Sequence, residues 1–97
     1  MKRITNVEKV ANWIEGYMAT HKAEIDEIKR VYQTKNYHDI LDGLFMEFSS
    51  EGWIEILKQC EIKSFKEQHI YGLNKNFIRL ENDVINELEY RYWFKFK

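Results

Sequence analysis

Residues 5–32, TNVEKVANWIEGYMATHKAEIDEIKRVY, repeat apolar side chains at alternating spacings of four and three residues. This period places them on one face of an α-helix. The repeating positions are Val7, Ala11, Ile14, Met18, His21, Ile25, Ile28 and Tyr32, and Val10 and Tyr17 widen the face. Thr5 and Glu8 form a capping box at its start, and Thr20 allows a break because threonine also caps helices. The segment therefore predicts a long N-terminal amphipathic helix. The positions expected to lie in one core are Ile14, Met18, Ile25 and Ile28.

A second apolar face at helical spacing follows. It consists of Tyr37, Ile40, Leu41, Leu44, Phe45 and Phe48. Asn36 is placed to cap this helix, and Gly43 inside it costs about 1 kcal/mol relative to alanine. The sequence Ser49-Ser50-Glu51 indicates a stop and a restart. Residues 53–57 fit either a helix or a short strand, because periodicity does not separate the two over five residues.

The last third of the sequence contains further helical signals. Ser64 and Glu67 repeat the capping-box spacing and open a short helix that Gly72 can close. Residues 73–77 have turn chemistry, which fits a link between helices or a hairpin. A helical period then continues to Tyr92, although residues 90–97 also alternate as a strand would.

These patterns predict a mostly α fold in which residues 1–97 form a single domain, a compact bundle of four or five helices. An α+β fold with a small central sheet from residues 53–81 is the alternative. A chain of 97 residues can bury one core, and a hydrophobic content of 44 % argues against intrinsic disorder.

Composition favours a cytoplasmic protein. No apolar run approaches the length of a membrane span, and the N-terminus lacks the apolar stretch of a signal peptide. The single cysteine, Cys60, fits a reducing compartment. Amino acids whose codons are AT-rich are frequent in the sequence. Such a composition is typical of proteins encoded by AT-rich genomes, including those of mobile elements.

Few residues have the spacing that catalysis or metal binding requires. His21, His38 and His69 lie far apart, and no His-x₃-His or Cys-x₂-Cys pair occurs. Cys60 has no recognisable nucleophile motif around it, and the neighbouring charge of Glu61 would raise the pKa of its thiol. We therefore expect no enzyme, no cofactor and no metal site. His21 is interpreted as a half-buried core residue and Cys60 as a small hydrophobe.

Charge is unevenly distributed although the net charge is −1. Between Lys35 and Lys58 no basic residue occurs, and the acidic residues there give −5. They are Asp39, Asp42, Glu47, Glu51 and Glu55. Residues 58–79 carry five basic residues against two acidic ones, a net +3. Ordinary solvated faces would explain both blocks. The functional interpretation is an acidic patch, with Asp39, Asp42 and Glu51 as its candidate residues, that docks on a basic partner surface.

The C-terminal segment contains five aromatic residues within residues 90–96, interleaved with Arg91 and Lys95. One small core cannot bury every ring. In a helix, Trp93 lies about 100° around the axis from Tyr92, at the margin of the buried face. The segment therefore either closes the core with one or two rings exposed or forms an association surface. Its aromatic and basic residues also suit stacking on single-stranded nucleic acid, which the acidic remainder of the protein disfavours.

The sequence predicts a small protein-interaction module, a regulator or inhibitor. Its partner is another protein or, in a homodimer, a second copy of the chain. Tyr, Trp and Arg dominate binding hot spots. The candidate protein-binding residues are therefore Tyr90, Arg91, Trp93 and Phe94, together with the acidic patch. The alternative is a helix-turn-helix-like DNA-binding regulator formed by residues 51–73. Its turn lacks glycine, and a pI near 6.3 disfavours nucleic acid as the partner.

Overall fold

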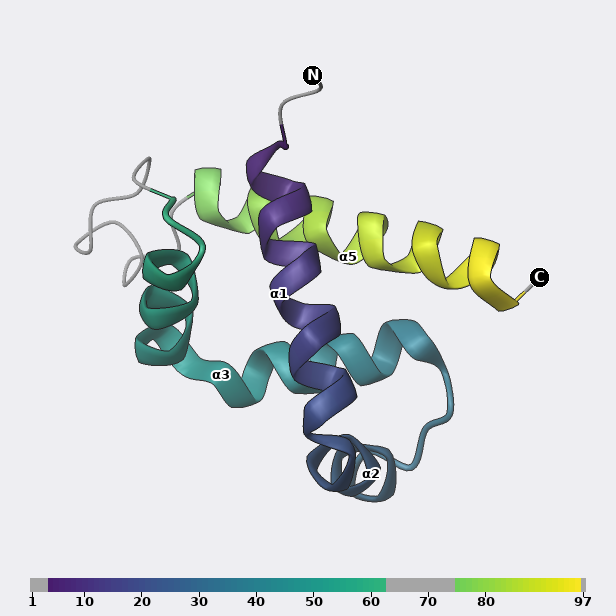
Figure 1. Cartoon of the computed structure of the whole chain (residues 1–97). Helices are drawn as coiled ribbons and strands as arrows, with labels where there is room; N and C mark the ends of the chain where they lie inside the picture. Colours follow the sequence, from purple (N-terminus) through teal and green to yellow (C-terminus); the bar gives the residue numbers. More distant parts are fainter. Residues whose placement is uncertain (1–3, 63–74, 97) are drawn as a thin grey trace.

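The computed structural model describes residues 4–62 and 75–96, and every regular element in these two ranges is an α-helix. In chain order the helices are α1 (Asn6–Thr20), α2 (Lys22–Val31), α3 (Tyr37–Gln59) and α5 (Lys75–Phe96), arranged as Figure 1 shows. The predicted helical bundle is confirmed. None of the described helices is both long and apolar enough to cross a membrane.

The strand alternatives are wrong wherever the structure describes them. Residues 53–59 and 75–81 are helical, so they form no central sheet, and residues 90–96 continue α5 as a helix. Periodicity left these short segments ambiguous, and packing of their apolar faces against other helices selects the helix. The predicted helix between Ser64 and Gly72 lies outside the described residues, as do residues 73 and 74 of the turn after it. The rest of that predicted turn is wrong, because residues 75–77 begin α5 as a helix.

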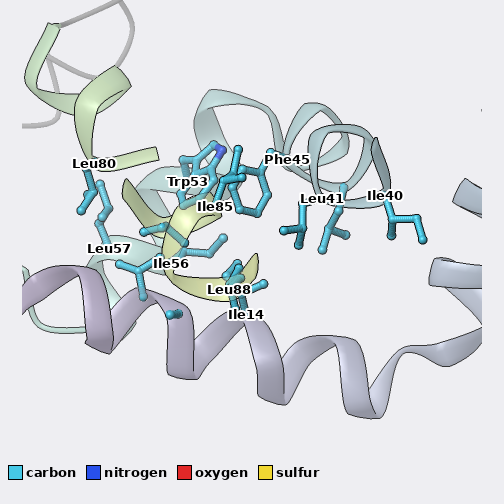
Figure 2. Packing of buried hydrophobic residues seen from close by; sticks show 14 of the residues in the cluster. Ile14, Ile40, Leu41, Phe45, Trp53, Ile56, Leu57, Leu80, Ile85 and Leu88 are labelled. Atoms are coloured by element: carbon cyan, nitrogen blue, oxygen red, sulfur yellow. The ribbon is translucent and has the colours of Figure 1, made fainter. Parts of the chain in front are cut away.

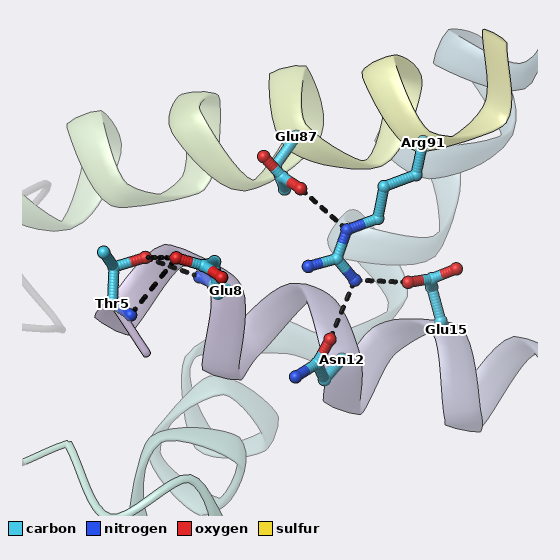
Figure 3. Close-up of polar contacts among 6 residues, drawn as sticks. All are labelled: Thr5, Glu8, Asn12, Glu15, Glu87 and Arg91. Atoms are coloured by element: carbon cyan, nitrogen blue, oxygen red, sulfur yellow. Dashed lines mark hydrogen bonds and ion pairs between the residues drawn. The ribbon is translucent and has the colours of Figure 1, made fainter. Parts of the chain in front are cut away.

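The long N-terminal helix is divided into α1 and α2 at His21, one residue after the threonine that allowed a break. The capping box at its start is confirmed, since Thr5 Oγ1 accepts from the Glu8 amide at 3.1 Å (Figure 3). Thr20 does not cap α2; its hydroxyl donates back to the Gly16 carbonyl at 3.0 Å. The division turns His21 out of the apolar face. Its predicted half-buried core position is wrong, because the ring is exposed and stacks on Tyr17.

The hydrophobic core lies between α1, α3 and α5 (Figure 2). The side chains without exposed surface are Val10, Ala11, Ile14, Leu41, Leu44, Val84 and Leu88. Ile25 and Ile28 of α2 are also buried, as predicted, whereas Met18 is half-buried. Full burial of an aliphatic side chain contributes about 1.5–3 kcal/mol.

Helix α3 bends at Ser49, where φ is 60° and ψ is 177°. This confirms the predicted stop and restart, and Figure 1 shows the second half leaving the direction of the first. The bend carries Trp53, Ile56 and Leu57 back onto the core. In the first half, Gly43 has a packing role: an added Cβ would lie 2.9 Å from Ile28 Cγ2. Glycine therefore allows α2 and α3 to approach closely.

The end of α3 places Cys60 at the C-cap, where its side chain is half-buried. Its Sγ lies 3.8 Å from the Lys9 carbonyl of α1. Burial raises the pKa of this thiol. The group is packed against the core rather than activated as a nucleophile, which agrees with its interpretation as a small hydrophobe.

Candidate interaction surface at the end of helix α5

Helix α5 has one buried face, and the C-terminal aromatic side chains that the structure describes are all at least 40 % exposed. The core contacts come from Leu80, Val84 and Leu88. On the far side of the helix lie Tyr90, Trp93 and Phe94, which are 61 %, 68 % and 68 % exposed. The Tyr90 and Phe94 rings are 4.7 Å apart, as expected for neighbours one turn apart. We name these three side chains the C-terminal aromatic surface.

Tyr92 faces the opposite way and fastens α5 to the start of α3. Its ring stacks on Tyr37 with centroids 4.3 Å apart and planes 12° from parallel. Burial raises the pKa of Tyr37 to about 12, and the negative charge of Glu15 adds to this effect. The prediction that Tyr92 and Trp93 cannot both face the core is confirmed, since Tyr92 packs on α3 and Trp93 stays exposed.

Arg91 was predicted from the sequence as a partner-binding residue. Its guanidinium instead forms hydrogen bonds and ion pairs with residues of the same chain (Figure 3). Nε donates to Glu87 Oε2 at 2.7 Å, and Nη1 donates to Asn12 Oδ1 at 2.8 Å and to Glu15. Only 24 % of the Arg91 side chain is exposed. Arg91 therefore holds α5 against α1. The four-residue spacing from Glu87 was visible in the sequence, whereas the contacts with α1 depend on the tertiary fold.

The structure brings two of the three predicted acidic-patch residues together. Asp39 and Asp42 are exposed on the first turns of α3, beside the end of α5. Asp39 accepts from Thr34 Oγ1 at 3.0 Å, and Asp42 Oδ2 lies 3.3 Å from His38 Nε2. Glu51 is also exposed but lies beyond the bend at Ser49. Glu51 follows Asp42 by nine residues, which is about 180° around a helix axis, so it would face away from Asp42 even without the bend.

His38 joins the acidic start of α3 to α5, a contact that sequence reasoning missed. Its Nδ1 pairs with the Glu89 carboxylate. The pKa of His38 is raised, chiefly by the hydrogen bond with Glu89 and further by the charges of Asp42 and Asp39. The His38–Asp42 pair has a four-residue spacing that the sequence displays, but nothing in the sequence indicates Glu89.

Glu81 is a second acidic residue that the sequence did not single out. It lines a hollow of about 490 Å³ together with Asp42 and the side chains of Phe45, Met46 and Trp53. Burial raises the pKa of Glu81, and the charge of Asp42 raises it further. The acidic surface near α5 therefore centres on Asp39, Asp42 and Glu81 rather than on Glu51.

Within residues 4–62 and 75–96, no group of three or more His, Cys, Asp or Glu side chains is arranged to hold a metal ion. The helix-turn-helix alternative depends mainly on residues 63–73, which lie outside the described residues. Comparisons with protein-family models, with curated proteins and with solved structures found no match.

Proposed function

We propose that the protein is a protein-interaction module, a small regulator or inhibitor that binds a partner protein through the C-terminal aromatic surface. One observation carries this proposal: Tyr90, Trp93 and Phe94 are each more than half exposed on one side of a single helix. Large aromatic side chains bury about 150–250 Å² each when covered. Contiguous exposed apolar surface of this kind marks interaction sites in soluble domains.

The negative charge near the C-terminal aromatic surface favours a partner whose contact surface is bordered by basic residues. Arg91 is engaged with Glu15, Glu87 and Asn12, so its positive charge is compensated internally. Trp93 lies one helical turn after Glu89, which contacts His38 at the start of α3. The acidic residues of α3 therefore border the aromatic surface on the side of Trp93. Complementary charge at such a rim speeds and orients association more than it adds affinity.

The test is Trp93→Ala, with Val31→Ala as the matched control. Val31 is 58 % exposed at the end of α2 and belongs neither to the aromatic surface nor to the acidic hollow. Both variants should fold, as judged by circular dichroism. Truncating a hot-spot tryptophan costs about 2 kcal/mol of binding or more, roughly thirtyfold in affinity.

Two measurements read out the effect: self-association by analytical ultracentrifugation, and quantitative capture of partner proteins from cells that express the protein. We expect Trp93→Ala to weaken at least one of them about thirtyfold and Val31→Ala to change neither. The proposal is wrong if Trp93→Ala folds normally and leaves both unchanged.

A further inference from the structure

A groove of about 560 Å³ opens between α1, α2, the start of α3 and the end of α5. Its walls are largely apolar and include Met18, Ile25, Ile40 and the stacked pair Tyr37 and Tyr92. This volume lies within the range of about 300–1,000 Å³ that is usual for small-molecule sites. The residues of the C-terminal aromatic surface do not line it.

Two lysines lie at the groove, and the fold positions both. Lys29 belongs to the last turns of α2 and forms an ion pair at 4.0 Å with Asp26, whose side chain is largely exposed. Lys35 follows a tight turn in which Gln33 has φ 50° and the Thr34 amide donates to the Lys29 carbonyl at 3.1 Å. No ion pair of Lys35 occurs in the described structure. The turn therefore places a second lysine, Lys35, among the residues that line the groove with Lys29.

The net charge of the groove is positive. Its one acidic residue, Glu15, is paired with Arg91, which leaves Lys29 and Lys35 uncompensated by groove residues. An apolar wall beside two cations is complementary to a molecule with an apolar body and an anionic end.

We propose that this groove binds a small amphipathic carboxylate, of the class of a medium-chain fatty acid. The apolar chain lies against Met18, Ile25 and Ile40, and the carboxylate pairs with Lys29 and Lys35. Hydrogen bonds between an ammonium group and a carboxylate are charge-assisted and about twice as strong as neutral ones. Burial of the chain supplies most of the affinity, and the lysines select the charge of the head group.

The experiment titrates the full chain with sodium decanoate below its micelle concentration. Binding is measured by calorimetry and located by amide chemical shifts in nuclear magnetic resonance spectra. Decanol and decyltrimethylammonium carry the same chain length with a neutral and a cationic head group. We expect decanoate to shift the amides of residues 18, 25 and 40, and to bind at least tenfold more tightly than either analogue.

Two sets of variants decide the site. The pair Lys29→Gln/Lys35→Gln should weaken decanoate binding at least tenfold, whereas Lys9→Gln/Lys22→Gln, which removes the same charge from positions that do not line the groove, should change it less than twofold. Ala19→Trp fills the groove from the exposed end of α1 and should abolish binding with both lysines in place.

Equal binding of decanoate and decanol, or an unchanged affinity in the Lys29/Lys35 variant, would overturn the proposal, and so would amide shifts confined to the α5 aromatic surface. Trp93→Ala should retain full decanoate binding. Failure of the groove proposal is therefore distinguishable from failure of the protein-interaction proposal.

Discussion

The two tryptophans Trp53 and Trp93 have opposite environments in the same small molecule. Trp53 is 3 % exposed and makes edge-to-face contacts with Phe45 and Phe77, at centroid distances of 5.0 and 5.4 Å. Trp93 is 68 % exposed although it lies in the most aromatic segment of the chain. Aromatic density therefore does not measure burial. What differs is the number of helices around each ring, because α3 folds back on the core whereas α5 ends at its edge (Figure 1).

The sharpest test of this comparison introduces the same charge into both regions. Ile14 of α1 has no exposed surface, so Ile14→Asp buries an unpaired carboxylate at a cost of several kcal/mol. That cost is comparable to the total stability of a small domain, about 5–15 kcal/mol. We expect the variant to be unfolded at 25 °C by circular dichroism. Phe94→Asp, on the exposed side of α5, should melt within a few degrees of the parent protein. An Ile14→Asp variant that melts with the parent would refute the core assignment.

Alanine substitution of the two tryptophans gives the next largest difference. Trp53→Ala should lower the free energy of unfolding by about 3–5 kcal/mol, because it empties a well-packed aromatic site. Trp93→Ala should change it by about 0.5 kcal/mol or less, as is usual for exposed positions. Urea denaturation followed by far-ultraviolet circular dichroism measures both values. Equal losses in the two variants would show that Trp93 is a core residue.

The attachment of α5 to α1 can be tested at Arg91. Arg91→Ala removes the contacts with Glu15, Glu87 and Asn12, of which Glu15 is 41 % exposed. Solvent screening reduces the value of such pairs, so we expect a loss of about 1 kcal/mol in the free energy of unfolding. A double-mutant cycle with Glu15→Gln isolates the contact between the helices. A coupling energy of zero would mean that the ion pair does not fasten α5.

Sequence periodicity predicted most of the fold because each buried face follows the 3.6-residue repeat. It located Ile14, Ile25 and Ile28 in the core, the Asn36 cap and the restart after Ser49. The repeat itself did not locate the division at His21, where only the neighbouring Thr20 allowed a break, since the apolar repeat continues through a residue that the backbone turns outward. When the apolar repeat keeps the same period across a break between two helices, the spacing of the apolar residues does not show where the break lies.

The candidate site was less predictable, because its contacts join residues far apart in the sequence. Helical geometry placed Trp93 at the margin of the buried face, and the structure leaves it exposed. The engagement of Arg91 by Asn12 and Glu15 depends on how α1 and α5 pack, and the pairing of His38 with Glu89 depends on how α3 and α5 pack. The groove depends on four segments meeting at one place. Each of these features depends on helix packing, which single-sequence periodicity does not specify.

The smallest expected effect concerns pH and the attachment of α5 to α3. His38 pairs with Glu89 and Asp42, and Asp39 adds negative charge nearby. These groups raise the pKa of His38 above its ordinary value of 6.5 in the folded protein. The unfolded chain therefore loses this proton at a lower pH than the folded one. The stabilisation is present in full below pH 6.5 and is lost as the pH rises through the folded pKa.

The free energy of unfolding should accordingly decline as pH rises above 6.5, by a small amount because about half of the His38 side chain is exposed. Urea denaturation at a series of pH values measures this decline. His38→Gln should reduce it, and Glu89→Gln should reduce it in the same way by removing the principal partner. His21→Gln is the matched control, since its ring contacts Thr20 and Tyr17 rather than a carboxylate in the described structure. If His38→Gln and His21→Gln change the pH dependence equally, His38 does not fasten the end of α5. The exposed aromatic surface would then depend on Tyr92 and Arg91 alone for its position.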